Sequence, residues 1–314
     1  MPAPRIVRIE RLDEASTRAV EEMLGCAAVH QRHSPIGEHK FVRLVEGEAD
    51  TLGLLASVGA EIVGYAQATS FPARGALPRR LAAELLVDPA HRGGGIGRAL
   101  FERLLGIARS DGAERFDVWA HHADAAATGL ATAYRMRVSR QLWQMALQLD
   151  SVAPRHRSMK PPDGIRLRPF RTGADEERML AVIRDAFGKH PENAAFDADD
   201  LAARAILPWF DASAILLAED ATSGETLGVH WMKLDRGKAV GEVYMLAVVG
   251  AAQGRGVGRL LLLEGLDEMR RRGLALSFLY VDATSVSAVE LYRRAGFRHE
   301  HLDTCYSLDL GEQG

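Results

Sequence analysis

The sequence contains Arg92-Gly93-Gly94-Gly95-Ile96-Gly97 and, 161 residues later, Gln253-Gly254-Arg255-Gly256-Val257-Gly258. Each copy follows a short apolar run that ends in valine, Leu85-Leu86-Val87 or Leu246-Ala247-Val248. Each copy also opens a leucine-rich stretch with the periodicity of a helix. The chain is therefore an internal duplication whose repeated unit joins a strand to a helix through a glycine loop.

The glycine loops favour a phosphorylated ligand. Glycine lets the backbone turn sharply and approach a ligand closely, and the N–H groups at a helix start attract anions together with the helix dipole. Neither copy ends in the Gly-Lys-Ser/Thr of a Walker loop, and the glycines do not follow the G-x-G-x-x-G dinucleotide pattern. The sequence thus predicts two phosphate sites, with a ligand-free glycine turn as the alternative.

Length and composition narrow the class of protein. A chain of 314 residues suggests about two domains, and 47% hydrophobic and 26% charged residues are ordinary for a globular protein. No apolar stretch approaches the roughly 20 residues of a membrane span. A net charge of −3 argues against a broad nucleic-acid surface. We therefore expect a monomer that binds neither membrane nor nucleic acid.

Cysteines and histidines give no indication of a metal or a disulfide. Cys26 and Cys305 are the two cysteines, and we expect both to be buried or half-buried thiols. Two cysteines and an N-terminus without an apolar signal core suit a cytoplasmic protein. The only adjacent histidines, His121 and His122, do not share a face of a helix or strand, so no metal is expected.

Prolines mark a break between the two copies. Residues 151–163 include Pro154, Pro161 and Pro162 and are predicted to be a linker. The predicted domains are residues 1–150 and 164–314.

Both domains repeat one order of elements, which fits an α/β sheet with helices on both faces. The expected strands are 5–11, 52–58, 61–70, 83–87, 116–120, 138–149, 165–170, 214–219, 226–234, 238–248, 277–281 and 297–310. The expected helices are 13–29, 38–45, 97–108, 123–133, 175–187, 199–207, 257–272 and 285–294.

An Arg/Gln-x-x-Gly-x-Gly loop after a strand resembles the acetyl-CoA pyrophosphate loop of the GCN5-related N-acetyltransferases. The resemblance implies two tandem acetyltransferase domains, each a mixed, mostly antiparallel sheet flanked by helices, with acetyl-CoA as co-substrate and up to one site per domain. The contacts it implies are Leu85, Leu86, Val87, Gly93, Gly94, Gly95, Ile96, Gly97 and Arg98 in the first half, and Leu246, Ala247, Val248, Gln253, Gly254, Arg255, Gly256, Val257, Gly258, Arg259, Ser285, Val286, Ser287, Ala288, Val289 and Glu290 in the second.

The two halves differ at the positions that carry acid–base chemistry. Acetyl transfer to an amine needs a base for the ammonium proton and an acid for the leaving thiolate. Glu242 resembles the family's base and Tyr292 its acid. The spacing of 161 residues places Leu81 and Ala131 at these positions in the first half, and neither can transfer a proton. The first half is therefore expected to bind acetyl-CoA without catalysing.

Longer segments resemble one family of tandem acetyltransferases, the mycothiol synthases. They are residues 188–192, 228–233, 241–246 and 279–282, and in the first half residues 34–38, 83–87 and 118–121. The resemblance covers nearly the whole chain. It implies transfer of acetyl to the cysteinyl amine of cysteinyl-glucosaminyl-inositol (desacetylmycothiol), giving mycothiol and CoA. The substrate contacts it implies are Glu38, Glu192, Lys233, Glu242 and Tyr280.

Two departures from the family pattern affect the expected ligand contacts. Thr284-Ser285 stands where the family often has Asp-Asn, although serine can still cap a helix. Gly93-Gly94 stands where basic residues are common, which should weaken CoA binding in the first half.

Three other functions stay open at this point. The chain could acetylate another amine, such as an aminoglycoside or a protein N-terminus. It could be a non-catalytic acyl-CoA sensor, which the presence of Glu242 and Tyr292 opposes. A purely structural repeat does not explain two intact phosphate loops.

Overall fold

The computed structural model describes residues 4–31, 36, 41, 44–47, 49–73, 77–121, 125–151, 162–188 and 196–311. Contacts divide the chain into two compact units. The first unit comprises residues 1–142 and 302–314, and the second comprises residues 143–301.

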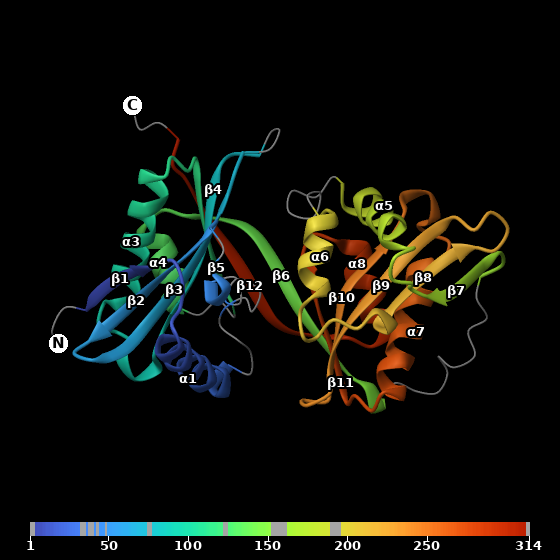
Figure 1. Cartoon of the computed structure of the whole chain (residues 1–314), viewed down its shortest axis with the longest axis horizontal. Coiled ribbons are helices and arrows are strands. Elements are labelled where there is room, and N and C mark those ends of the chain that lie inside the picture. Colours follow the sequence, from blue (N-terminus) through green and yellow to red (C-terminus); the bar gives the residue numbers. More distant parts are fainter. Residues whose placement is uncertain are drawn as a thin grey trace. The chain divides into compact units, whose positions relative to one another are not determined.

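The first unit is a mixed sheet with the strand order β1-β2-β3-β4-β5-β12 (Figure 1). Neighbouring strands are antiparallel except for β4 and β5, which are parallel. The elements are β1 (Arg5–Ile9), α1 (Glu14–Gln31), β2 (Thr51–Val58), β3 (Glu61–Phe71), β4 (Arg80–Val87), α3 (Ile96–Ser110), β5 (Arg115–Ala120), α4 (Ala125–Ala133) and β12 (Arg298–Asp309).

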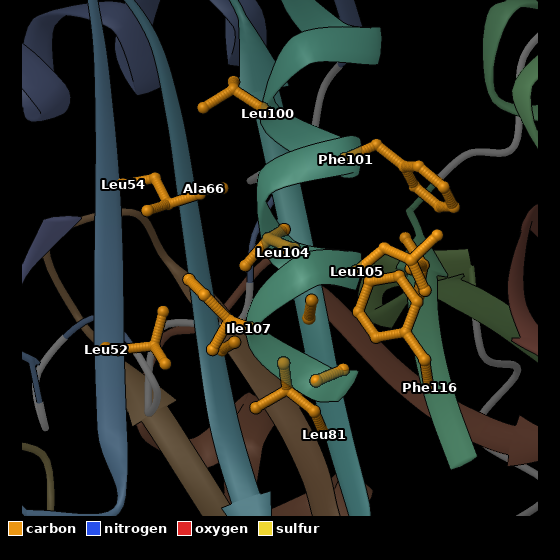
Figure 2. Close-up of a cluster of buried hydrophobic side chains, with 14 of the residues drawn as sticks. Leu52, Leu54, Ala66, Leu81, Leu100, Phe101, Leu104, Leu105, Ile107 and Phe116 are labelled. Carbon is orange, nitrogen blue, oxygen red and sulfur yellow. The ribbon is translucent and has the colours of Figure 1, made fainter. Parts of the chain in front are cut away.

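Helices α3 and α1 cover opposite faces of this sheet. Leu100 of α3 packs in one cluster with Leu54 and Ala66, as Figure 2 shows. Tyr65, the neighbour of Ala66 along β3, packs instead with Val20 of α1. Successive strand residues point to opposite faces, so two buried layers explain why β2 and β3 are apolar nearly throughout.

The second unit repeats this arrangement with the order β6-β11-β10-β9-β8-β7, in which β10 and β11 are parallel. Trp231 packs with Ile183 of α5 on one face, while its neighbour Met232 packs with Leu266 of α7 on the other. The elements are β6 (Arg137–Gln148), β7 (Ile165–Pro169), α5 (Glu176–Phe187), α6 (Ala198–Ala205), β8 (Ile215–Asp220), β9 (Thr226–Asp235), β10 (Val240–Val248), α7 (Val257–Arg271), β11 (Leu276–Asp282) and α8 (Val286–Ala295).

The last strand of each half is not confined to the unit of its own half. Residues 302–309 of β12 belong to the first unit, where Thr304 to Asp309 pair antiparallel with β5. Residues 143–148 of β6 belong to the second unit, and β6 is the neighbour of β11. The domains expected from the sequence follow the chain, so their ranges differ from the compact units at these strands.

Two glycines show that the duplication extends to helix packing. A Cβ atom on Gly64 would lie 3.0 Å from Ile96 and 3.1 Å from Leu100, and one on Gly228 would lie 2.8 Å from Leu261. Leu100 and Leu261 are 161 residues apart and face the same glycine position. In both units the helix that follows the glycine loop therefore approaches the sheet where there is no side chain.

The expected strands and helices are confirmed within a few residues, and the structure describes only part of the expected helix 38–45. Cys305 is buried as expected, but the expectation for Cys26 is wrong, because Cys26 is exposed. The buried stripe of α1 consists of Val20, Met23 and Ala27 at helical spacing, and Cys26 lies off this stripe. No described helix is long and apolar enough to span a membrane.

Gly265 of α7 offers a test of this packing. His230 is fully buried beneath it and donates from Nδ1 to the carbonyl oxygen of Leu261 at 2.9 Å. A Cβ on Gly265 would lie 2.1 Å from the ring, so Gly265→Ala should lower the free energy of unfolding by roughly 1–3 kcal/mol in urea denaturation.

Gly106 of α3 is the matched control for that substitution. It is exposed, and a Cβ there meets nothing within 4 Å. Gly106→Ala should raise the stability by up to about 1 kcal/mol, since alanine favours helix. Equal effects of the two substitutions would show that His230 does not limit the space at Gly265.

Candidate active site

The two glycine loops have nearly identical backbone geometry. Gly93 and Gly95 have φ of 79° and 84°, and Gly254 and Gly256 have φ of 76° and 84°. These left-handed values favour glycine. Gly95 and Gly256 are the N-caps of α3 and α7, and neither cap supplies a side-chain hydrogen bond. The first N–H groups of both helices can therefore serve an anion.

Each loop is tied to the strand before it by the same contact. Arg92 donates from Nε to the carbonyl oxygen of Val87 at 3.3 Å. Gln253 donates from Nε2 to the carbonyl oxygen of Val248, also at 3.3 Å. The expected cofactor contacts thus lie at the ends of β4 and β10, on the glycine loops and the helix starts after them, and at Ser285 and the first half of α8.

Strand β10 contains a bulge at Tyr244. Val243 is the partner of Met232 on β9, and Met245 is the partner of Trp231, so Tyr244 is one residue extra. Both Tyr244 and Met245 consequently pack on the α5 side of the sheet. The parallel ladder with β11 ends at the pair Glu242–Phe278, and the two strands separate beyond it.

Strand β4 of the first unit has no bulge. Its register with β3 runs unbroken from Val87–Gly64 to Arg80–Phe71, and its ladder with β5 continues to Glu84–Trp119. The corresponding loops of the two units are otherwise superimposable in sequence, so the bulge is a single-residue difference between the units.

This difference corrects the position expected to match Glu242. Glu242 pairs with Phe278, and the residue 161 positions before Phe278 is Asp117, which pairs with Ala82. The structural counterpart of Glu242 is therefore Ala82 and not Leu81, because the bulge adds one residue between Glu242 and the loop. Alanine cannot transfer a proton either, so the chemical difference between the units remains.

Glu242 and Tyr292 approach the bulge from different elements. Glu242 is half-buried on β10, directly opposite Lys233 on β9. Tyr292 of α8 is 7% exposed and packs in one cluster with Val243, the residue after Glu242. Burial raises the pKa of the Tyr292 hydroxyl, so the phenol stays protonated and able to donate.

Sequence analysis missed a group of residues around Tyr244. Arg204 of α6 donates from Nε to the Tyr244 hydroxyl at 2.7 Å. The rings of Trp209 and Tyr244 are 5.1 Å apart, and the ammonium of Lys233 lies 4.9 Å from the Trp209 ring centre. Burial raises the pKa of Tyr244 while Arg204 opposes the shift, and Glu242 and Lys233 also act on it. These side chains therefore share one space beside Glu242.

The remaining expected substrate residues have different standings. Tyr280 is 43% exposed on β11, and its hydroxyl accepts a hydrogen bond from Nε2 of Gln144 at 3.1 Å. Glu38 and Glu192 lie outside the described residues. Among the residues that the structure describes, no group of three or more His, Cys, Asp and Glu side chains is placed to hold a metal ion.

The first unit has a buried polar network where its longer ladder ends. Gln67 donates from Nε2 to Glu84 at 2.7 Å. His121, which follows β5, lies 3.5 Å from Glu84 through Nε2 and 2.8 Å from Asp303 through Nδ1. Burial opposes a charge on His121, but the two carboxylates outweigh it and raise the pKa of His121 to about 10. The imidazole is therefore positively charged at neutral pH.

Comparison with known proteins gives a consistent result. The family model described as Acetyltransferase (GNAT) family matches residues 17–134 and 178–297. The chain is 39% identical over 303 residues to a protein named mycothiol acetyltransferase from Nocardia farcinica, covering 96% of each chain. It is 37% identical to the mycothiol acetyltransferase of Streptomyces avermitilis, covering 97% of this chain and 95% of that one.

Solved structures share the fold of the whole chain. A tandem GNAT protein from the clavulanic acid biosynthesis pathway matches with a TM-score of 0.79 at 17% identity, covering 99% of this chain and all of that one. A GCN5-related N-acetyltransferase from Sphaerobacter thermophilus matches with a TM-score of 0.73 at 24% identity, covering 97% and 95%.

The charge on His121 predicts an alkaline loss of stability. Its pKa in the folded chain, about 10, lies above the ordinary value of 6.5. The stabilising contribution is therefore complete below about pH 6.5 and disappears as the pH rises through 10. His121→Asn should lower the free energy of unfolding by roughly 3 kcal/mol at pH 6, because it leaves buried carboxylates without their cation.

The same measurement at higher pH tests the assignment. The stability gap between the wild type and His121→Asn should narrow in urea denaturation between pH 7 and pH 10. A gap that stays constant over this range would mean that His121 is not the titrating cation of the network.

Proposed function

The chain belongs to the GNAT acetyltransferase family, and we propose that it transfers the acetyl group of acetyl-CoA to the cysteinyl amine of cysteinyl-glucosaminyl-inositol, giving mycothiol and CoA. The observation that carries this proposal is the similarity to mycothiol acetyltransferases over nearly the whole length, at 39% and 37% identity in the two relatives described above. The second unit is the proposed catalytic unit.

Glu242 is the proposed base. The acceptor amine is largely an ammonium at neutral pH, and only its free form can attack a thioester. Glu242 accepts the ammonium proton, directly or through a water. The nitrogen then forms a bond to the acetyl carbonyl carbon, and the carbon–sulfur bond breaks. The position of Glu242 at the last pair before β10 and β11 separate supports this role.

Tyr292 is the proposed acid. The departing thiolate of CoA needs a proton, and a buried phenol with a raised pKa keeps its proton until a strong base forms beside it. The packing of Tyr292 against Phe297, with ring centres 5.8 Å apart, holds the phenol ring in place.

The backbone supplies the proposed cofactor contacts. Beyond Glu242, β10 is released from β11, so Leu246 to Val248 can pair with the pantetheine arm as an added strand would. One N–H group there can polarise the thioester carbonyl. Residues 253–259 would hold the pyrophosphate and residues 285–290 would flank the thiol end. Each contact is available to acetyl-CoA without a metal.

The acceptor carries an ammonium and many hydroxyl groups. Lys233, Tyr280, Glu38 and Glu192 are its proposed contacts, with Glu242 at the reacting nitrogen. We add the wall formed by Arg204, Tyr244 and Trp209, because these side chains surround the same space as Lys233 and Glu242. The first unit is proposed to bind acetyl-CoA at residues 85–87 and 93–98 without catalysing. The chain is proposed to act as a cytoplasmic monomer.

Mass spectrometry of a reaction with purified protein, acetyl-CoA and cysteinyl-glucosaminyl-inositol tests the function. The expected product carries one acetyl group on the cysteinyl nitrogen and forms together with one CoA. A thiol dye is unsuitable, because the substrate has its own thiol. Binding of CoA without acetylation of this acceptor would contradict the proposal and direct the search to other amines.

Glu242→Gln should lower turnover by roughly 10²–10⁴-fold in the same assay. Glutamine keeps the shape but cannot accept the proton, so the affinity for CoA should change little. Glu225→Gln, at an exposed glutamate before β9, is the matched control and should have turnover close to the wild type. Normal turnover of Glu242→Gln across the pH range would exclude Glu242 as the base.

Tyr292→Phe should lower turnover by roughly 100-fold, since the hydroxyl proton is lost while the ring packing is kept. Tyr134→Phe, which removes the hydroxyl that contacts Glu102 in the first unit, controls for the loss of a phenol elsewhere. If both variants turn over alike, another group protonates the thiolate.

A further inference from the structure

The strands that lead into the two glycine loops differ in how far they are open to a ligand. In the first unit, only Leu85 to Val87 of β4 lie beyond the last pair with β5. In the second unit, Val243 to Val248 of β10 lie beyond the last pair with β11. At about 3.3 Å per residue these segments measure about 10 Å and about 20 Å. An arm anchored at the loop therefore meets closed sheet much earlier in the first unit.

The missing bulge removes a second feature from the first unit. A bulge bends a strand and redirects its backbone groups, and bulges are enriched beside active sites. In β10 the bulge at Tyr244 directly precedes the segment proposed to face the thioester. In β4 the register is unbroken, so no backbone N–H is redirected toward a ligand at the equivalent position.

Buried charge occupies the end of the first unit's ladder. By register, Glu84 and Gln67 correspond to Met245 and Trp231 of the second unit. Glu84 is 3% exposed and bonds Gln67, and the charged His121 lies beside it. Inserting an acyl thioester between β4 and β5 would have to break this network and leave a carboxylate without its partners, which is costly in a buried site.

We infer that the first unit is a site for CoA irrespective of its acyl group. It takes the pyrophosphate on the loop of Gly93 to Gly97 and leaves the thiol end outside the sheet, where an acetyl group touches nothing. This inference rests on the proposed binding of CoA by the first glycine loop. The second unit, in contrast, takes the thioester between its strands.

Two loop variants of the full chain separate the sites. Gly95 and Gly256 both have φ of 84°, a conformation that a β-branched residue strongly disfavours. Gly256→Val therefore leaves the first site available, and Gly95→Val leaves the second. Each variant is titrated by calorimetry with CoA and with acetyl-CoA, and infrared spectra are recorded with acetyl-CoA labelled with ¹³C at the carbonyl.

The inference predicts a distinct signature for each variant. Gly256→Val should bind CoA and acetyl-CoA with dissociation constants within about twofold of each other, and the bound thioester should keep the carbonyl frequency it has in water. Gly95→Val should lower that frequency, since a backbone N–H polarises the carbonyl. A lowered frequency in Gly256→Val would overturn the inference, because the first unit would then also insert the thioester.

Failure of the underlying binding proposal is recognisable separately. If Gly256→Val is folded and binds neither ligand, the first loop is not a CoA site and the inference falls with it. The wild type covers the case in which a variant does not fold. At a measured stoichiometry of two, it should show one lowered and one unchanged carbonyl band. Two lowered bands would overturn the inference.

Discussion

The bulge at Tyr244 is the constraint on which the second unit's proposed chemistry depends. It adds one residue to β10, and the ladder with β11 ends at Glu242. From that point the strand can offer its backbone to a ligand instead of to a neighbouring strand. The same residue places the Tyr244 hydroxyl against Arg204, beside Lys233 and Glu242. One local irregularity thus connects the cofactor side of the sheet with the acceptor side.

The first unit shows what the same duplication becomes without that residue. Its glycine loop keeps the left-handed φ of Gly93 and Gly95, so the anion site at the start of α3 is geometrically intact. Its strand remains straight, and the ladder is closed by Glu84, Gln67 and His121. Carboxylates that satisfy a buried imidazolium stabilise the unit, whereas a catalytic site needs groups that are free to change their partners.

Periodicity and turn chemistry were sufficient to predict nearly every element of the fold. The glycine loops marked the strand-to-helix connections, and Glu242 and Tyr292 stood at positions that a repeat comparison could single out. The one-residue bulge could not be read from a spacing of 161 residues, since the loops fix that spacing downstream of it, and Glu242 was therefore matched to Leu81 instead of Ala82. The exchanged strands and the contacts of Arg204 and Trp209 depend on tertiary pairing that local sequence does not encode.

The central claim is that the second unit performs acetyl transfer and the first does not. Steady-state product formation, followed by mass spectrometry for Gly256→Val and Gly95→Val with cysteinyl-glucosaminyl-inositol as acceptor, tests it most directly. Gly256→Val should lose at least about 100-fold in rate, because the strained residue disrupts the loop that feeds the second unit, while Gly95→Val should lose far less. A larger loss in Gly95→Val than in Gly256→Val would contradict the account.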